Sequence, residues 1–221
     1  MGRTFFAGVD LGQKRDPTAL AVVERGEADG VLPLRHLERM PLGTPYTNVV
    51  ERLGTLMRHP ALAGRSRMVV DATGVGAPVV DMLREAGLAG VMTAVTITSG
   101  ERAHGEGERW HVPRRDLLAG LEVLLEYGEL KICRRLGEAE RLVRELTSVR
   151  MRGGGSEHDD LVMAVGLACW RARDGGVGVG RGGCRGFEGL SAISGQFSVV
   201  SLFQERFYEH SCIFGERTER A

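Results

Sequence analysis

The sequence lacks an excess of charge, a cysteine motif and a histidine pair at metal-ligand spacing. Lys plus Arg number 29 and Asp plus Glu number 29, so the chain as a whole has no electrostatic bias toward nucleic acid or membrane, and any basic surface must be local. Four cysteines are present without a C-x-x-C motif, which argues against a zinc site and a disulfide framework. This cysteine usage fits a reducing cytoplasm.

Long apolar runs are also missing. The longest, LVMAVGLACW at 161–170, and the short N-terminal stretch FFAGVD are both too short for a signal peptide or a membrane span. We therefore expect a soluble, cytoplasmic protein with no membrane partner. With 221 residues, 43% of them hydrophobic, the chain is long enough for one domain with a sizeable core and a tail.

The first half of the chain has the pattern of an α/β fold. Short apolar stretches joined by polar turns predict a meander of three strands, at residues 4–9, 18–24 and 32–38. The spacing then predicts helix, strand, helix and strand, at 48–59, 67–72, 76–87 and 90–97. A strand, helix and strand in succession give a parallel pair with a right-handed crossover.

The second half predicts a loop, three helices and a tail. Residues 99–111 are polar and glycine-bearing, which indicates an exposed, mobile loop. Helical periodicity follows at 113–128, 138–151 and 158–173. The segment 174–221 begins with a glycine-rich stretch without periodicity, so we expect a linker and a tail that are disordered or weakly structured.

Four aspartates stand at comparable places in these elements. Asp10 ends the first strand, Asp71 ends the fourth, and Asp159 and Asp160 begin the last helix. Adjacent parallel strands place Asp10 and Asp71 side by side at one edge of the sheet. Because clustered carboxylates repel one another and lose hydration, such a cluster needs a cation, and oxygen ligands favour Mg²⁺ or Mn²⁺.

A structural role is the alternative for each aspartate taken alone. An aspartate after a strand is commonly a turn residue. Asp159 stands where an N-cap is expected, so its side chain could simply accept hydrogen bonds from helix amides. The occurrence of GVDLG, VDATGVG and HDDLVMA in one chain favours the cluster.

Over residues 4–173 the chain resembles the nuclease domain of the large terminase subunit of tailed phages. The matching segments are GVDLG with DPTALAVVE, VVDATGVGAPVVDMLREAG, VPRRDLLAGLEVLLEYGELKI and HDDLVMAVGLACW. The resemblance implies a ribonuclease H-like (RuvC-like) α/β domain over residues 1–173. Its mixed five-stranded sheet is expected in the order 3-2-1-4-5, with the first three strands antiparallel, strands 1, 4 and 5 parallel, and helices on its flanks.

The resemblance also implies a metal-dependent endonuclease that cuts double-stranded DNA during phage genome packaging in a bacterial host. Asp10, Asp71 and Asp160 are then the metal ligands, and Asp159 is a cap or a residue supporting them within the catalytic set. The implied chemistry is in-line attack by water on a phosphodiester, with two ions about 3.5 to 4 Å apart bridged by Asp10. Many relatives have another acidic residue where this chain has Met163.

Glycines and cations near these segments have interpretations that follow from a DNA substrate. The glycines flanking Asp10, with Gly74 and Gly76, are interpreted as leaving room for the phosphate. His158 is a candidate for orienting water, or an incidental surface residue. Candidate contacts to the DNA backbone, which could equally be ordinary surface cations, are Lys14, Arg15, Arg102, Arg109, Arg114 and Arg115.

A packaging motor is not evident in the sequence. There is no G-x-x-x-x-G-K-[ST], and ATGVGAP has no lysine to reach a phosphate. The expected partners are therefore DNA and a separate packaging ATPase, portal or small terminase subunit, and a separately encoded nuclease or a degenerate prophage fragment both stay open. Two other functions also stay open: a Holliday-junction resolvase of the same fold, and a non-catalytic remnant that binds DNA.

Overall fold

The computed structural model describes most of the chain up to the end of the last predicted helix. The described residues are 2–12, 14, 16–26, 30–74, 76–149, 159–174 and 207–208. Arg15, His158 and nearly all of the predicted tail lie outside them. No helix among the described residues is both long and apolar enough to cross a membrane.

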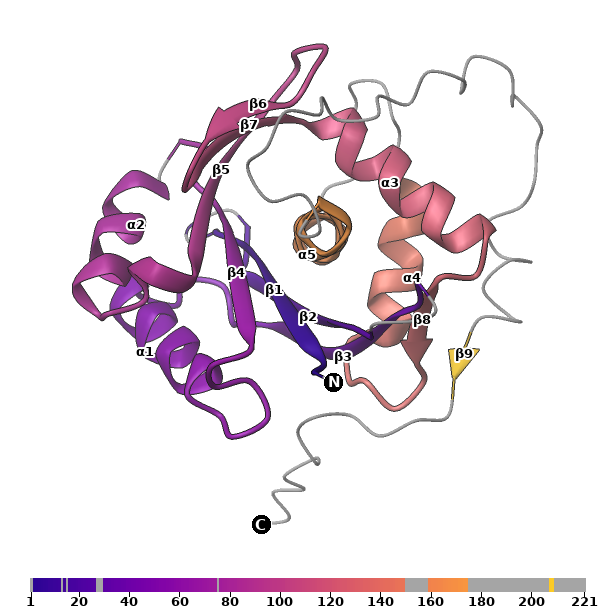
Figure 1. Ribbon diagram of the computed structural model, residues 1–221, viewed down its shortest axis with the longest axis horizontal. Coiled ribbons are helices and arrows are strands. Elements are labelled where there is room, and N and C mark those ends of the chain that lie inside the picture. Colours follow the sequence, from indigo (N-terminus) through magenta and orange to yellow (C-terminus); the bar gives the residue numbers. More distant parts are fainter. Residues whose placement is uncertain are drawn as a thin grey trace.

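A mixed sheet of nine strands forms the centre of the described chain, in the order β6-β7-β5-β4-β1-β2-β3-β8-β9 (Figure 1). The strands are β1 (Thr4–Asp10), β2 (Ala19–Arg25), β3 (Leu32–Arg39), β4 (Ser66–Asp71), β5 (Met92–Thr98), β6 (His104–Glu106), β7 (Arg109–Pro113), β8 (Leu130–Cys133) and β9 (Phe207–Tyr208). β1 and β3 are antiparallel to β2, whereas β4 and β5 run parallel to β1. The predicted mixed α/β class is confirmed, within a sheet wider than the five strands expected.

Helices cover both faces of the sheet (Figure 1). They are α1 (Tyr46–Met57), α2 (Gly76–Glu85), α3 (Arg114–Glu126), α4 (Ala139–Ser148) and α5 (Asp160–Asp174), with a short 3-10 turn at Ala89–Val91. α1 and α2 bury one apolar cluster against the sheet, and α3, α4 and α5 bury a second one on the opposite face. α5 runs over the middle of the sheet and makes its most extensive contacts with β1 and β2.

Gly8 allows α5 to lie close to β1. Alternate residues of β1 point to the same face of the sheet, so Phe6, Gly8 and Asp10 all face α5. A Cβ at position 8 would overlap the carbonyl oxygen of Ala164 in α5. In the same way, a Cβ at Gly12 would overlap backbone of the β1–β2 loop. Room for a phosphate is therefore the wrong explanation for these two glycines, because atoms of the chain itself occupy the space.

A β-hairpin replaces the loop predicted at 99–111. β6 and β7 pair in antiparallel fashion, and β7 pairs in parallel with β5. Gly107, with φ of 57°, lies in the connecting turn, and the Trp110 ring meets the Trp170 ring of α5 edge-on at 5.7 Å between centroids. All three residues of β6 are exposed, so the sequence contains no buried alternation that would predict this strand.

Candidate active site

Asp10 and Asp71 lie side by side at one edge of the sheet. The parallel register pairs Val9 with Val70, and each aspartate is the next residue of its strand. Val69 belongs to the core beneath α5, so Asp71, two residues further on, faces the same side as Asp10. The strand-end argument from the sequence therefore correctly predicts that these two side chains meet.

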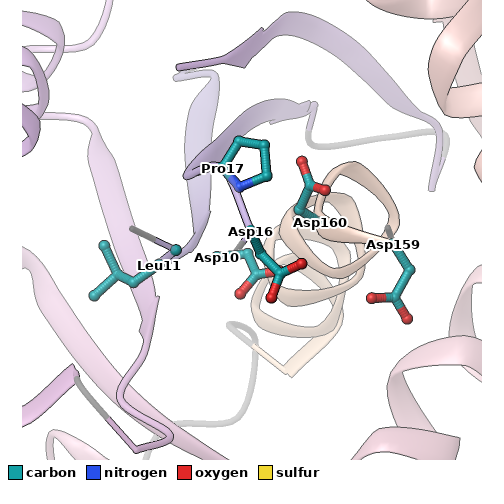
Figure 2. Close-up of a pocket in the computed structure, with 7 residues that line it drawn as sticks. Asp10, Leu11, Asp16, Pro17, Asp159 and Asp160 are labelled. Carbon is teal, nitrogen blue, oxygen red and sulfur yellow. The ribbon is translucent and has the colours of Figure 1, made fainter. Parts of the chain in front are cut away.

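The start of α5 brings two more carboxylates to this edge. Asp160 is the first residue of α5, with only 3% of its surface exposed, and Asp159 directly precedes it. A small pocket of about 110 Å³ lies between this helix end and the β1–β2 loop (Figure 2). Its lining residues are Asp10, Leu11, Gly12, Asp16, Pro17, Asp159 and Asp160. Asp16, which the sequence analysis does not single out, adds another carboxylate.

The carboxylates repel one another. Loss of hydration on burial raises the pKa of Asp10 well above its ordinary value, and the negative charges of Asp71, Asp160, Asp159 and Asp16 raise it further. Burial also raises the pKa of Asp71, although hydrogen bonds oppose the shift. Such a site favours a bound cation, because a positive charge at its centre relieves both costs.

Thr73 fixes the position of Asp71. Its backbone N–H and its hydroxyl both donate to Oδ1 of Asp71, at 2.8 and 2.5 Å. The same hydroxyl oxygen accepts the N–H of Ile97 in β5 at 2.8 Å. The end of β4 is thus tied to its neighbour, and one oxygen of Asp71, Oδ2, is left outside these bonds.

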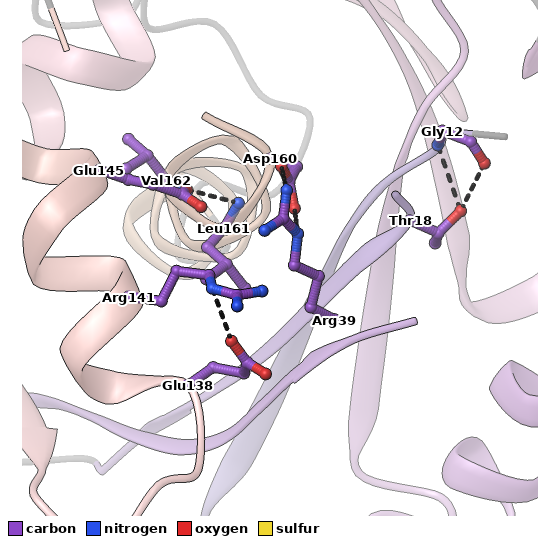
Figure 3. Close-up of polar contacts among 9 residues, drawn as sticks. All are labelled: Gly12, Thr18, Arg39, Glu138, Arg141, Glu145, Asp160, Leu161 and Val162. Carbon is purple, nitrogen blue, oxygen red and sulfur yellow. Dashed lines mark hydrogen bonds and ion pairs between the residues drawn. The ribbon is translucent and has the colours of Figure 1, made fainter. Parts of the chain in front are cut away.

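Thr18 fixes the loop that follows Asp10. This buried hydroxyl donates to the carbonyl oxygen of Gly12 at 2.8 Å and accepts the N–H of Gly12 at 3.2 Å (Figure 3). The two bonds close the β1–β2 connection around one side of the pocket. Thr18 is a supporting residue that sequence reasoning missed.

Two arginines act as counter-ions for the carboxylates on α5. The Arg39 guanidinium contacts both oxygens of Asp160, with Nη2 to Oδ1 at 2.9 Å and Nε to Oδ2 at 2.7 Å (Figure 3). Arg114, at the start of α3, forms an ion pair with Asp159. The sequence analysis missed Arg39. This residue ends β3 at the same edge as Asp10, so the strand-end argument that predicted Asp71 applies to it as well.

Glu145 of α4 caps the helix that carries Asp160. Its Oε2 accepts the backbone N–H groups of Leu161 at 3.0 Å and Val162 at 3.3 Å (Figure 3). Burial and the charge of Asp160 raise the pKa of Glu145 to about 7. The hypothesis that the Asp159 side chain caps these amides is therefore wrong, since a residue from another helix does so.

Some of the candidate DNA-contacting cations are exposed, and two of them, at the start of α3, have contacts within the chain. Lys14, Arg102 and Arg109 are exposed, the last two at the β6–β7 hairpin. Arg114 is paired with Asp159, and Arg115, also exposed, donates to the carbonyl oxygen of Glu101. Arg15 lies outside the described residues, as does the candidate water-orienting His158.

The donor set suits a hard divalent cation, because every candidate ligand is a carboxylate oxygen. Among the described residues, however, no three Asp, Glu, His or Cys side chains are already grouped as metal ligands. Two of the carboxylates are held by arginines instead. Met163 is buried in the core, so this position offers no ligand.

Comparison with known proteins adds to this geometry. No protein-family model matches the chain, and neither does any curated protein. Among solved structures, the large terminase nuclease from thermophilic phage G20c with bound magnesium is 23% identical, has a TM-score of 0.54, and is matched over 76% of this chain and 82% of that one. The chain has the fold of a terminase nuclease domain.

Two further structures share this terminase-nuclease fold. The Mn-soaked human cytomegalovirus terminase nuclease domain is 17% identical, with a TM-score of 0.50, over 75% of this chain and 82% of that chain. The large terminase of another thermophilic bacteriophage, in complex with ATP-gamma-S, is 13% identical, with a TM-score of 0.52. That match covers 74% of this chain but 38% of the phage terminase. The predicted resemblance is thus confirmed for the fold.

Proposed function

We propose that this protein is a divalent-metal-dependent endodeoxyribonuclease that cuts double-stranded DNA by hydrolysing a phosphodiester. The observation that carries the proposal is the position of Asp10 beside Asp71, with Asp160 at the N-terminus of α5, within a terminase-nuclease fold. Two structures with this fold are described with bound magnesium or a manganese soak, which supports Mg²⁺ or Mn²⁺ as the cofactor.

The residues that would hold the cation are Asp10, Asp71 and Asp160. A divalent cation bound there supplies electrostatic stabilisation of the charge that develops on the phosphate as water attacks. Thr73 holds one oxygen of Asp71 and so keeps this carboxylate beside Asp10. Glu145 and Arg39 hold the start of α5 and its Asp160 carboxylate next to the same edge.

The DNA would approach the edge of the sheet where these strands end. Exposed Lys14, Arg102, Arg109 and Arg115 are the candidate contacts to its backbone, since cations there replace counterions on the phosphates. We propose genome packaging as the setting. In that setting a separate ATPase, together with portal or small terminase subunits, translocates the DNA. The ATPase is proposed as a partner because this sequence has no G-x-x-x-x-G-K-[ST] phosphate-binding motif.

One cleavage assay tests the proposal. Supercoiled plasmid, linear duplex and a four-way junction are incubated with the protein in Mg²⁺ or Mn²⁺, beside Asp71→Asn and the control Asp81→Asn, which removes an exposed carboxylate on α2. We expect the parent and Asp81→Asn to cut plasmid and linear duplex, and Asp71→Asn to cut neither.

The substrates separate the alternatives. Cutting confined to the junction would identify a resolvase. The absence of metal-dependent cutting of every substrate by the parent would contradict the nuclease proposal and leave a DNA-binding remnant. Cleavage by Asp71→Asn at the parental rate would place the catalytic site elsewhere.

A further inference from the structure

Arg39 occupies a defined place in the sheet beside the carboxylate cluster. Ala19 of β2 is paired with Asp10 on one side and with Arg39 on the other, so the three residues form one row across β1, β2 and β3. Residues paired in this way point to the same face of the sheet, which here is the face covered by α5. Because the middle residue of the row is an alanine, no long side chain separates Arg39 from Asp10.

The Arg39 guanidinium takes both oxygens of Asp160 in a nearly buried pair. Nη2 donates a hydrogen bond to Oδ1 at 2.9 Å, and Nε lies 2.7 Å from Oδ2 as an ion-pair contact without hydrogen-bond geometry (Figure 3). The Arg39 side chain is 12% exposed and that of Asp160 is 3% exposed. Little water is therefore available to replace either partner.

This pair distinguishes Asp160 from the other two candidate ligands, because its carboxylate has an arginine partner. Asp10 and Asp71 lie together, but the third candidate ligand is directed to an arginine. A divalent cation near Asp160 would face the positive guanidinium a few ångströms away. A guanidinium and a metal ion at the same carboxylate repel each other, since both seek the same negative charge.

We propose that Arg39 is an internal cation that competes with the divalent metal for Asp160, and thereby sets how strongly the site binds metal. The proposal rests on the metal-dependent function proposed above and adds a positioning residue to it. While Arg39 contacts Asp160, the metal is bound by Asp10 and Asp71. Asp160 becomes a third ligand only when the guanidinium moves away from it.

A second buried ion pair on β3 provides a matched control. Arg35 contacts Glu24 at 2.8 Å, and the two side chains are 11% and 8% exposed, much like the Arg39 pair. Glu24 is paired with Phe5, at the edge of the sheet opposite Asp10. Arg35→Gln therefore removes an equally buried arginine of the same strand without touching the carboxylate cluster.

The test measures metal binding without DNA. Mn²⁺ is titrated calorimetrically into the parent, Arg39→Gln and Arg35→Gln, and thermal unfolding is followed with and without Mn²⁺. We expect both variants to unfold at lower temperature than the parent when metal is absent, because each removes a nearly buried ion pair. We also expect Arg39→Gln to bind Mn²⁺ about tenfold more tightly than the parent, and Arg35→Gln to bind it as the parent does.

Two further variants locate the effect. In an Asp160→Asn background, Arg39→Gln should give no gain in affinity, because the contested carboxylate is gone. Arg39→Lys keeps the charge but loses the guanidinium that contacts both oxygens of Asp160, so its affinity should lie between those of the parent and Arg39→Gln. If Arg39→Gln does not fold, Arg39→Lys carries the same test.

The possible failures are distinguishable. If the parent binds Mn²⁺ and the Arg39 variants bind it no more tightly, Arg39 is a structural or orienting residue and the competition is refuted. If neither the parent nor any variant binds Mn²⁺, the metal-dependent function itself fails and the competition fails with it.

Discussion

Glu145 of α4 accepts a hydrogen bond of 3.0 Å from the backbone N–H of Leu161 in the first turn of α5. The N-terminus of a helix carries unpaired N–H groups and partial positive charge, so a carboxylate there is favourable. Burial and the nearby charge of Asp160 oppose ionisation and raise the pKa of Glu145 to about 7. The helix carrying the candidate ligand thus depends on a carboxyl group that titrates near neutrality.

The stability of the metal-free protein should depend on this group. The folded pKa of Glu145 is about 7, above the ordinary 4.5, so its stabilising contribution is full below pH 4.5 and is lost as pH rises through 7. Glu145→Gln keeps an acceptor oxygen without the charge. We expect it to match the parent near pH 5 and to exceed the parent's unfolding free energy by about 2 kcal/mol at pH 8.

Urea unfolding at pH 5, 6, 7 and 8 measures this difference, with the exposed Glu51→Gln on α1 as the control. Glu51→Gln should follow the parent at every pH. A constant offset between the parent and Glu145→Gln across the range would show that Glu145 keeps its ordinary pKa.

Asp10→Asn should separate folding from metal binding. Burial and the neighbouring carboxylates raise the pKa of Asp10, so its ionisation destabilises the metal-free fold increasingly as pH rises through that raised value. We expect the metal-free variant at pH 8 to melt at the parental temperature or slightly above it, and to lose the stabilisation that Mn²⁺ gives the parent by mass action. It should not cleave DNA. Unfolding of the variant, with no Mn²⁺ effect on the parent, would make Asp10 a structural residue.

Asp159 gives a test of which carboxylate caps α5. If the Asp159 side chain were the cap, Ala would cost about 1 kcal/mol of stability relative to Asn, because Asn is also a good cap. Since the amides of Leu161 and Val162 bond to Glu145, Asp159→Ala and Asp159→Asn should unfold within about 0.3 kcal/mol of each other.

Glu145→Ala, which removes the cap seen in the structure, is compared with the two Asp159 variants. At pH 5, Glu145→Ala should lower the unfolding free energy by about 1 to 3 kcal/mol, because it leaves buried N–H groups unpaired. Equal stability of Glu145→Ala and the parent, with a clear gap between the two Asp159 variants, would return the capping role to Asp159.

The positions of Asp10 and Asp71 could be predicted from the sequence because both residues stand at strand ends. Asp10 and Asp71 follow apolar runs, and parallel neighbours must bring their ends to one edge. Arg39 obeys the same geometry, because β1 and β3 are both antiparallel to β2 and end at that edge too. It was missed because a charged residue after a strand is equally typical of a solvated surface.

Other features depend on contacts that sequence patterns do not encode. Glu145 lies on the stripe of α4 that buries Leu142, so a charge among apolar positions was a signal, but its partner amides come from a different helix. The exposed β6 strand offers no alternation of buried and exposed residues. For Gly8, a sequence cannot distinguish room left for a ligand from room filled by a helix.

Gly8→Ala distinguishes these two roles. The Cβ added to β1 would overlap the carbonyl oxygen of Ala164 in α5 and lie 2.6 Å from the backbone nitrogen of Ala168 in the same helix. Backbone atoms of a buried helix can move only if the whole helix moves, so we expect a loss of about 3 kcal/mol in unfolding free energy without metal or DNA.

Gly120→Ala in α3 is the control, because its Cβ would meet nothing within 4 Å. This variant should gain about 0.5 to 1 kcal/mol, since alanine favours helix over glycine. Urea unfolding compares both variants with the parent. If Gly8→Ala proved as stable as the parent yet failed to cleave DNA, the glycine would serve the approach of the phosphate, and close packing of α5 on β1 would not be its reason.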